Sequence, residues 1–420
     1  MILILSISIL FNTLFPLFDS NEIYYNTNTT QENTRPFVSG RVIDERNFPV
    51  PYAKVFINSA EIQTDVMGRF TVMNVEFPYD VIVAERNTST AVMYWGLSVT
   101  DPDLVLFGEP DKRNYNSASI KVMFPPNADT SECFVSFASR EMIHCETMTA
   151  GSGKDYVFLT VDFPASMTNI RGDVIMMRKN PSGYELFRRK SVSISRNTTR
   201  NEVVLPAKPE SRTSVKPSKI YSSLKDYYQS KIEVSLDLTD YSKNSQLTIY
   251  EADGKKQMTI ADLPAKLPAS TRLKINGFAE TRSGSKFVSH YFSSPGQNFK
   301  VSDEFLPELI VPSDGYIGVD GRTEFRYTVG SGAGVYVLEF RSRNPEMKYY
   351  VVTNETAGRL SLLSRPEFSN TRNLVFSWRV RKYLTYFSVD EFVRPNVFKN
   401  DLGYKGVLYS TGRSFRTGYF

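Results

Sequence analysis

Apolar and polar residues alternate through residues 39–83, and this alternation predicts short strands joined by turns. Residues 40–44 form one alternating run, and residues 53–57 form the next. Between the later runs, the Asp65 carboxylate can accept backbone N–H groups, and Gly68 can adopt a positive φ without a Cβ clash. The pattern therefore predicts a compact β unit with a tight turn before its next strand.

The same stretch carries a motif, G-x-V-x-D, then P-x-x-x-A-x-V, then T-D-x-x-G-x-F and a closing tyrosine. Over residues 36–108 this motif resembles the carboxypeptidase regulatory-like domain, a small transthyretin-like β-sandwich. The positions on the pattern are Gly40, Val42, Asp44, Pro49, Ala53, Val55, Thr64, Asp65, Gly68, Phe70 and Tyr79. Phe48 departs from it, because many members have a turn glycine there. The resemblance implies a fold and no reaction, since the motif residues are turn and core residues.

Short apolar runs recur at about ten-residue spacing after this unit, as in β-sandwiches. They predict a sandwich over residues 112–206 and another over residues 219–312, with a proline-containing linker at 207–218. Residues 221–228 could form one short helix. The ending NEVVLP of the second unit is echoed by FKVSDEFLPELIVP in the third, which suggests an internal repeat, with chance similarity as the alternative.

The last predicted domain covers residues 313–394. Its run Phe376-x-Trp378-x-Val380 before SVDEF resembles a fibronectin type III-like sandwich. Phe376 stands where that family usually has a tyrosine, so another immunoglobulin-like topology stays open. Residues 395–420 are interpreted as a tail. The fold class predicted for the chain is all-β, with β-sandwich domains in series.

Composition agrees with strands, since the chain has 24 Tyr and 29 Phe but no long stripe of apolar residues at helical spacing. The net charge of +5 is spread over many residues and does not indicate nucleic-acid binding. The apolar residues 1–18 predict an export segment, either a cleaved signal peptide or a retained anchor, followed by a spacer at 19–35. We therefore expect a secreted, periplasmic or cell-surface protein that contacts a membrane only through residues 1–18, if these are uncleaved.

The only cysteines, Cys133 and Cys145, lie at equal distances from Ser139. A hairpin that turned at Ser139 would place them opposite one another, within reach of a cross-strand disulfide. Export makes oxidation plausible. The alternative is two thiols packed as small apolar side chains.

Catalytic side chains are scarce, because the chain has only two histidines, His144 and His290. Alternation places His144 and Cys145 on opposite strand faces, which argues against a nucleophilic pair. Neither histidine has the spacing of a zinc peptidase site. The sequence therefore predicts no catalytic residue and no cofactor.

Calcium stays open as an alternative for two acidic pairs, Asp101 with Asp103 and Asp314 with Asp320, in place of solvated turn residues. The basic residues 188–190 and 379–382 are predicted to form polar strand faces, with contact to an anionic surface or polysaccharide as the alternative.

Tyr94 and Trp95 are adjacent, so on a strand one of them must face outward, and we expect a ligand contact there. Most other aromatic residues stand at alternate strand positions and are assigned to cores.

These observations predict an exported, non-enzymatic binding or scaffold protein of a cell surface or bacterial envelope, whose partner is a surface protein or a polysaccharide. The alternative is a protein that hydrolyses glycan or peptide with a carboxylate site between two domains.

Overall fold

The computed structural model describes residues 36–45, 48–58, 60–108, 115–125, 132–142, 144–150, 153–165, 167–196, 201–241, 245–394 and 406–418. All of them belong to one compact unit, Pro36–Phe420. They form strands almost throughout, which confirms the all-β class; the described helices are α1 (Val389–Phe392) and the 3-10 helices Leu224–Asp226, Ser361–Ser364 and Pro366–Thr371. None of the described helices has the length and apolar character to cross a membrane. The predicted export segment and spacer, residues 1–35, lie outside the described residues.

The first strands follow the predicted alternation. β1 (Phe37–Asp44) lies between the antiparallel β4 (Arg69–Met73) and the parallel β7 (Asp103–Leu106). The predicted turn is confirmed, because Asp65 Oδ1 accepts the backbone N–H groups of Met67 and Arg69 at 2.8 Å each. Gly68 has a φ of +72°, and a Cβ on it would lie 2.5 Å from the carbonyl oxygen of Val42. This position therefore requires glycine.

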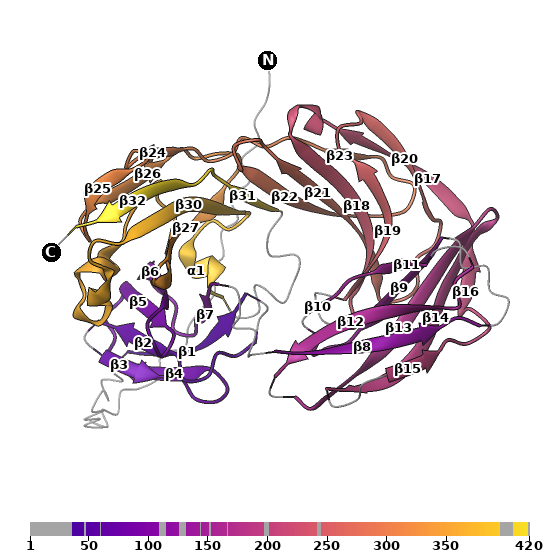
Figure 1. The fold of residues 1–420 in the computed structure, drawn as a ribbon, viewed down its shortest axis with the longest axis horizontal. Coiled ribbons are helices and arrows are strands. Elements are labelled where there is room, and N and C mark those ends of the chain that lie inside the picture. The colour runs from indigo at the N-terminus through magenta and orange to yellow at the C-terminus, as the bar shows by residue number, and fades with distance from the viewer. Residues whose placement is uncertain are drawn as a thin grey trace, which may run out of the picture. The chain divides into compact units, whose positions relative to one another are not determined.

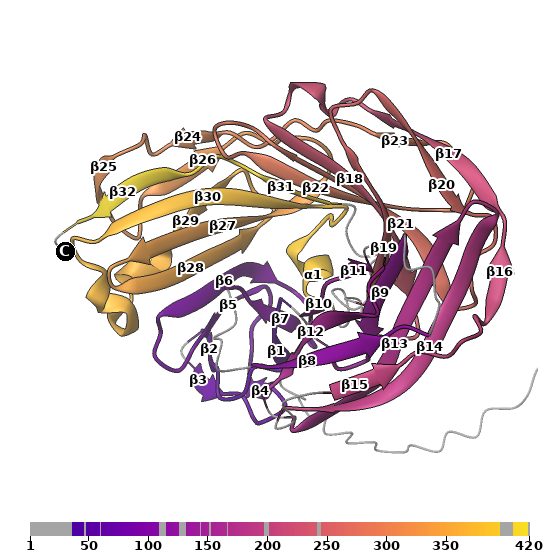
Figure 2. The same ribbon diagram turned by 45° about the vertical axis from the view of Figure 1, so that its right-hand side comes forward.

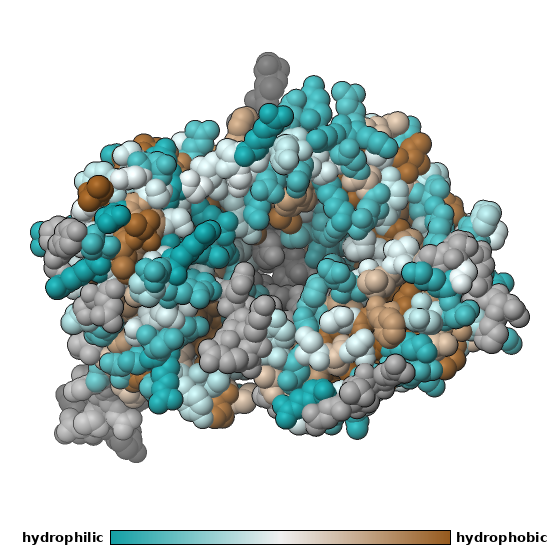
Figure 3. All heavy atoms as spheres, in the orientation of Figure 1, coloured by the Kyte–Doolittle hydropathy of each residue, from teal (hydrophilic) through white to brown (hydrophobic). Residues whose placement is uncertain are grey.

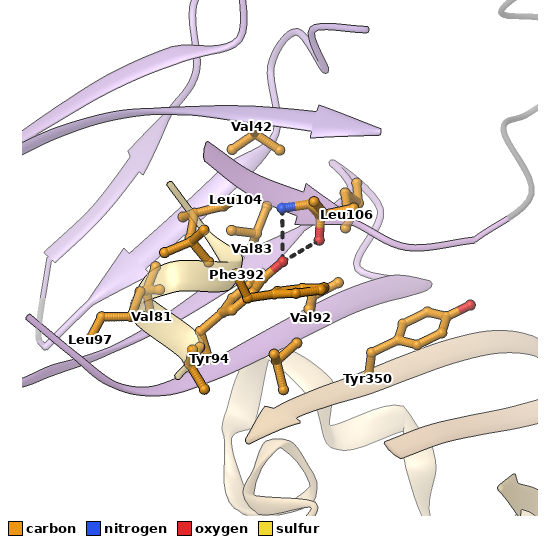
Figure 4. Packing of buried hydrophobic residues seen from close by; sticks show 14 of the residues in the cluster. Val42, Val81, Val83, Val92, Tyr94, Leu97, Leu104, Leu106, Tyr350 and Phe392 are labelled. Carbon is orange, nitrogen blue, oxygen red and sulfur yellow. Dashed lines mark hydrogen bonds between the residues drawn. The ribbon is translucent and has the colours of Figure 1, made fainter. Parts of the chain in front are cut away.

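The first hydrophobic core packs behind this sheet and encloses Tyr94 (Figure 4). The Tyr94 ring is fully buried, and its hydroxyl donates to the carbonyl oxygen of Val105 at 2.6 Å and accepts its N–H at 2.8 Å. The prediction that Tyr94 contacts a ligand is wrong, because Tyr94 occupies the inward phase of β6 (Thr90–Leu97). Trp95 takes the other phase and is half-buried against a different core, so its ligand contact stays a prediction.

Two facing sheets enclose a second core. One contains, in spatial order, β10 (His144–Cys145), β12 (Tyr156–Pro164), β8 (Tyr115–Met123) and β15 (Asn201–Val204). The other contains β11 (Met148–Ala150), β9 (Cys133–Ala138), β13 (Asn169–Asn180), β14 (Gly183–Ser195) and β16 (Ser211–Thr213). Short strands occupy most of the predicted sandwich region, residues 112–206, as its short apolar runs predict.

The predicted disulfide is not formed, and both cysteines carry buried thiols. The expected hairpin does not exist, because the chain crosses from one sheet to the other after β9. Cys133 pairs with Ala150 in one sheet, whereas Cys145 pairs with Val161 in the facing sheet. Desolvation raises the pKa of the Cys145 thiol to about 11. The alternative of two packed thiols describes the structure.

The predicted linker at 207–218 is largely strand. β16 pairs with β14, and β17 (Val215–Ser222) pairs with β20 (Met258–Pro264) and with β23 (Phe299–Val301). Ser218, Ile220 and Ser222 of β17 are buried at alternate positions, so the strand has an inward face despite Pro217. The prolines suggested a loop, but Pro217 occupies an exposed position where it does not disturb the core. Of the short helix suggested for residues 221–228, only the three-residue 3-10 helix Leu224–Asp226 is present, because Tyr221 and Ser222 end β17.

Three successive segments share one topological feature. In each, the first strand of a small sheet pairs in parallel with the last strand, as β1 with β7, β8 with β15 and β17 with β23. The NEVVLP ending supplies β15, and the longer ending of the third unit supplies β23 and then β24 (Leu309–Val311). β23 holds the position equivalent to β15, whereas β24 pairs antiparallel with β26 (Glu324–Tyr327), so the structure agrees with an internal repeat only for β23.

The remaining strands belong mostly to one large sheet, which has fourteen strands among the described residues (Figures 1 and 2). Its spatial order is β19 (Gln246–Asp253), β18 (Gln229–Leu238), β21 (Thr271–Glu280), β22 (Lys286–Ser293), β31 (Gly406–Tyr409), β30 (Val375–Leu384), β27 (Gly334–Arg343), β28 (Glu346–Thr353), β6, β5 (Tyr79–Ala84), β2 (Lys54–Ile57) and β3 (Ala60–Gln63). β32 (Arg413–Thr417) also pairs with β30, and β25 (Tyr316–Val319) pairs with β32.

This sheet joins strands that the sequence assigned to separate domains. β28 pairs in parallel with β6, from Lys348 opposite Thr90 to Val352 opposite Tyr94. β31 lies between β22 and β30, so the expected tail is a structural part of the sheet. Both faces of β27, β28 and β6 are buried, each against a different core. The first and fourth predicted domains therefore pack against one another through cores to which both contribute residues.

A small sheet of β24 (Leu309–Val311), β26 (Glu324–Tyr327) and β29 (Ala357–Arg359) covers the second face of this region. Phe325 from β26 packs edge-on against Trp378 and Phe340 of the large sheet, with ring centroids 4.9 and 4.8 Å away. Trp378 and Phe376 are buried, as their predicted core phase requires.

Candidate functional site

The face of the molecule in Figure 3 is mostly hydrophilic, with apolar side chains in small separate groups. Polar arrangements are therefore the places to examine for function. Two of them stand out: an open groove on the outer side of β13 and β14, and a cluster of arginines on the large sheet.

The groove has a volume of about 750 Å³. Its floor comes from paired positions of β13 and β14, where Arg171 lies opposite Ser193 and Asp173 lies opposite Ser191. These side chains alternate with buried residues such as Ile170, so the strand period turns them outward.

One wall of the groove is the turn after β9. Its anchor is Ser139, which is 1% exposed. The Ser139 hydroxyl lies 2.7 Å from the carbonyl oxygen of Arg171 and 2.9 Å from Glu141 Oε2. This turn also meets the segment after β18, because the Arg140 Nε donates to the carbonyl oxygen of Asp240 at 3.4 Å.

Tyr241 forms the opposite wall and is tied to the floor. Its hydroxyl donates to Asp173 Oδ2 and accepts a hydrogen bond from Arg189 Nη1 at 3.1 Å. Ser191 donates to Asp173 Oδ1 at 2.6 Å. Burial, together with the hydrogen bond to Asp173, raises the pKa of Tyr241 to about 12. Both oxygens of Asp173 are thus already used by protein donors.

The second site, which we call the arginine cluster, surrounds Glu339 of β27. The Glu339 side chain is 1% exposed and accepts hydrogen bonds from Arg379 at 2.9 and 3.1 Å and from Arg381 at 2.7 Å. Arg341 forms a further ion pair with it. Burial alone would raise the pKa of Glu339, but the guanidiniums of Arg381 and Arg379 outweigh burial and lower it.

The arginine cluster connects distant parts of the chain. Arg381 Nη1 donates to Glu45 at 3.0 Å, and Glu45 also accepts the backbone N–H of Gly108 at 3.1 Å. Tyr409 of β31 completes the cluster. Its ring centroid lies 5.6 Å from the Arg379 guanidinium, 5.8 Å from that of Arg381 and 5.1 Å from Lys286 Nζ. Its pKa is raised by burial.

Three of the four acidic residues considered for calcium, Asp103, Asp314 and Asp320, have protein partners. Arg41 binds Asp103 through two hydrogen bonds of 2.8 and 2.5 Å, which neutralises that carboxylate and leaves no need for a cation. Asp314 accepts from the Ser414 N–H and hydroxyl at 2.6 and 2.8 Å, and Asp320 accepts from Thr323 in its own turn. Within the described ranges, no group of three His, Cys, Asp or Glu side chains could hold a metal ion.

The basic runs of the sequence are mostly internal. Arg188 is 7% exposed and donates to Glu185 at 2.8 Å, while Arg381 and Lys382 are 7% and 1% exposed. The interpretation as solvated polar faces is wrong for these three residues, because carboxylates and carbonyl oxygens of the protein bind them, whereas Lys190 is exposed as predicted. Lys382, for example, donates to the carbonyl oxygen of Val329 at 2.9 Å. His144 is exposed and Cys145 is buried, which confirms that they occupy opposite faces.

Sequence reasoning missed an exposed aromatic pair on β12. Tyr156 and Phe158 are 43% and 52% exposed, with ring centroids 5.4 Å apart, while Val157 and Leu159 face the core. The segment YVFLT is apolar in both phases. Thr160 stands at the next alternate position after Tyr156 and Phe158. This polar residue is the sequence signal that the three positions face outward, and Thr160 is exposed in the structure.

Comparisons with known proteins find matches among solved structures only. No family model matches the chain, and no curated protein matches it. Among solved structures, similarity is found to a tetra-tandem repeat in the extending region of a large adhesion protein, at 8% identity, covering 91% of this chain and 100% of that chain, with a TM-score of 0.19. The major pilin subunit of Bacillus cereus shows 10% identity, coverage of 64% and 98%, and a TM-score of 0.13. A bacterial ice-binding adhesin shows 7% identity, coverage of 91% and 96%, and a TM-score of 0.16. TM-scores this low do not establish a common fold, so the functional argument rests on the residues of this chain.

Proposed function

We propose that this chain is an exported, non-enzymatic binding and scaffold protein of a cell surface or bacterial envelope, and that its groove binds a polysaccharide. The observation that carries the proposal is the hydrogen bonding of the polar side chains in the groove. It presents polar side chains to solvent, yet its central carboxylate, Asp173, has both oxygens engaged by protein donors. Such an arrangement suits recognition of a hydroxyl-rich ligand better than a reaction.

The groove supports a binding role because its walls are already fixed. Ser139 ties one wall to the floor, and Tyr241 ties the other. A ligand would therefore meet ordered side chains, and little free energy would be lost in ordering the site. The hydroxyls of Ser191 and Ser193 line the floor, and hydroxyls of this kind exchange hydrogen bonds readily with sugar hydroxyls.

The domain identities belong to the same proposal. We propose that residues 36–108 are a carboxypeptidase regulatory-like domain and that residues 313–394 are a fibronectin type III-like domain, with two further sandwiches between them. Support for the first comes from the Asp65 turn and from the motif's closing Tyr79, whose buried hydroxyl donates to the carbonyl oxygen of Val99 at 2.8 Å.

Polysaccharide binding can be tested by blocking the groove. In Ser193→Trp an indole would fill the floor of the groove, and the matched control Ser119→Trp places the same side chain on the outer face of the other sheet of this sandwich. The full-length variants are compared by pull-down on soluble dextran, mannan and an envelope polysaccharide extract from the producing cells. We expect Ser193→Trp to lose binding and Ser119→Trp to keep it. Equal binding by the two variants, binding to none of the three probes, or recovery of a protein in place of a polysaccharide would overturn the groove assignment.

The proposal that the protein is not an enzyme needs a separate measurement. The same polysaccharides and a casein substrate are incubated with the protein and analysed for new reducing ends and new amino termini. We expect neither product. Products that disappear in a variant lacking Glu141 and Asp240, the other carboxylates of the groove, would favour the hydrolase alternative. Cell fractionation tests the location, and recovery in the soluble cytoplasm would contradict export.

A further inference from the structure

We infer that the arginine cluster binds the anionic group of an acidic polysaccharide, a carboxylate or a sulfate. The site is separate from the groove, and it does not depend on what the groove binds. It comprises Arg341 of β27, Arg379 and Arg381 of β30, Tyr409 of β31 and Lys286 of β22, all arranged around Glu339.

The first argument is the balance of charge. Four cations, Arg341, Arg379, Arg381 and Lys286, gather around Glu339 and Tyr409, whereas the cluster holds two carboxylates, those of Glu339 and Glu45. Two carboxylates cannot neutralise four cations, and Arg341 and Arg379 are partly exposed, so an anion from solution can reach the surplus charge. The excess of positive charge leaves room for an anion.

The second argument is the supply of hydrogen-bond donors. Arg379 directs Nε and Nη2 to Glu339, and Arg341 meets Glu339 through Nε. A guanidinium carries five N–H donors, so in the contacts among described residues each of these two arginines keeps donors for another acceptor. The side chains of Arg341 and Arg379 are 34% and 32% exposed, and a solute can therefore reach them.

The third argument is rigidity. Arg341 and Arg379 stand on neighbouring paired strands, and the buried Glu339 holds both guanidiniums from below. Ser377 lies directly opposite Arg341 and is exposed, so it adds a hydroxyl beside the guanidiniums. Guanidinium groups that are fixed in this way match the paired oxygens of carboxylates and sulfates and lose little conformational freedom on binding.

The experiment uses the full-length protein and three polymers: dextran sulfate, polygalacturonate and neutral dextran. Binding is measured by biolayer interferometry at several salt concentrations. The test variant is Arg341→Gln, and the matched control is Arg326→Gln on β26, which removes the same charge from an exposed side chain paired with Glu324 at 3.1 Å. Arg341→Lys keeps the positive charge but loses the planar guanidinium, which can donate two parallel hydrogen bonds. Emission from Trp378, next to the cluster on β30, verifies that each variant is folded.

We expect one or both acidic polymers to bind, with an affinity that falls as salt rises. Arg341→Gln should weaken this binding roughly tenfold, Arg341→Lys should weaken it less, and Arg326→Gln should leave it unchanged. Binding by both acidic polymers would indicate that the cluster recognises negative charge in general. Binding by only one would show whether the site fits a sulfate or a carboxylate. No binding by either polymer, or equal losses in Arg341→Gln and Arg326→Gln, would overturn the inference. Neutral dextran reports on the groove alone, so failure of the two proposals can be distinguished.

Discussion

Glu339→Gln is the sharpest test of what joins the distant strands of the large sheet. Glutamine keeps the shape of the side chain and removes the charge that three guanidiniums share. Arg381 is the critical partner, because its side chain is only 8% exposed and would stay buried, with Glu45 as its remaining carboxylate. Arg341 and Arg379 are about one-third exposed and can turn to water in its absence.

Removing one partner of a buried ion pair typically costs about 3 to 5 kcal/mol. The lower end applies here, about 3 kcal/mol, because two of the three arginines are partly solvated and the amide oxygen of the introduced glutamine still accepts a hydrogen bond. The matched control is Glu346→Gln on the neighbouring β28. That side chain is 73% exposed and pairs with Lys348 at 2.9 Å, so its loss should cost less than about 1 kcal/mol.

The assay is urea unfolding followed by tryptophan emission, since Trp378 precedes Arg379 on the same strand and is 1% exposed. We expect a clear decrease of the unfolding midpoint in Glu339→Gln and a small one in Glu346→Gln. Equal decreases in the two variants would show that Glu339 does not hold the junction.

The pH dependence gives a second check. The folded-state pKa of Glu339 is lowered, so its stabilising contribution is present above the unfolded value, about 4.3, and is lost as pH falls through the folded value. The difference in stability between the native protein and Glu339→Gln should therefore be constant near neutral pH and shrink below about pH 4. A difference that persists unchanged in acid would refute the assigned charge state.

Three further predictions test the packing. Leu159→Ala should cost about 2 to 5 kcal/mol of unfolding free energy and Phe158→Ala less than about 1 kcal/mol, because only Leu159 faces the core of the second sandwich; urea unfolding of both variants measures this. Gly68→Ala should lower the thermal midpoint more than Gly284→Ala. Both glycines have positive φ, but only a Cβ at Gly68 meets another backbone atom, and calorimetry compares the two. Iodoacetamide without reductant should leave Cys145 unmodified at pH 8 in the native protein, because burial raises the pKa of its thiol to about 11. After unfolding, intact mass should show two added groups, and a mass with none would indicate a disulfide.

Local features of the fold could be predicted because they depend on neighbouring residues. Alternation located β1 and β2, and the side chain of Asp65 with the positive φ of Gly68 fixed the turn before β4. The prediction of a linker at 207–218 was wrong because Pro217 is compatible with an exposed strand position. Composition alone does not show which residues of a strand face solvent.

Features that depend on long-range pairing could not be predicted. The disulfide prediction assumed a local hairpin, whereas Cys133 and Cys145 pair with strands of two different sheets. Likewise, β28 and β6 are far apart in the sequence, and their paired residues are almost all apolar, so the pattern gives no indication of the partner. The site prediction named both Tyr94 and Trp95, because alternation shows that one of two adjacent residues faces outward without showing which, and Tyr94 is the buried one.

The residues of the arginine cluster follow a regular spacing in the sequence, but the meaning of this spacing becomes clear only in the large sheet. Glu339 and Arg341 are two residues apart, as are Arg379 and Arg381, so each pair lies on one strand face. Such spacing is typical of a solvated polar face. Only the pairing of β27 with β30 shows that the four side chains meet, with Glu339 opposite Arg379.

This arrangement also explains how the register of the large sheet is specified. A slip of β30 by one residue against its neighbours would turn its arginines toward the face that carries Trp378, inside the aromatic core with Phe325 and Phe340. Each unpaired charge buried there would cost several kcal/mol. Apolar pairs such as those between β28 and β6 stabilise many registers almost equally. The charges around Glu339, in contrast, find their partners of opposite charge in only one register. We therefore attribute the register of the junction to its charged residues and most of its stability to the apolar cores on the two faces of the sheet.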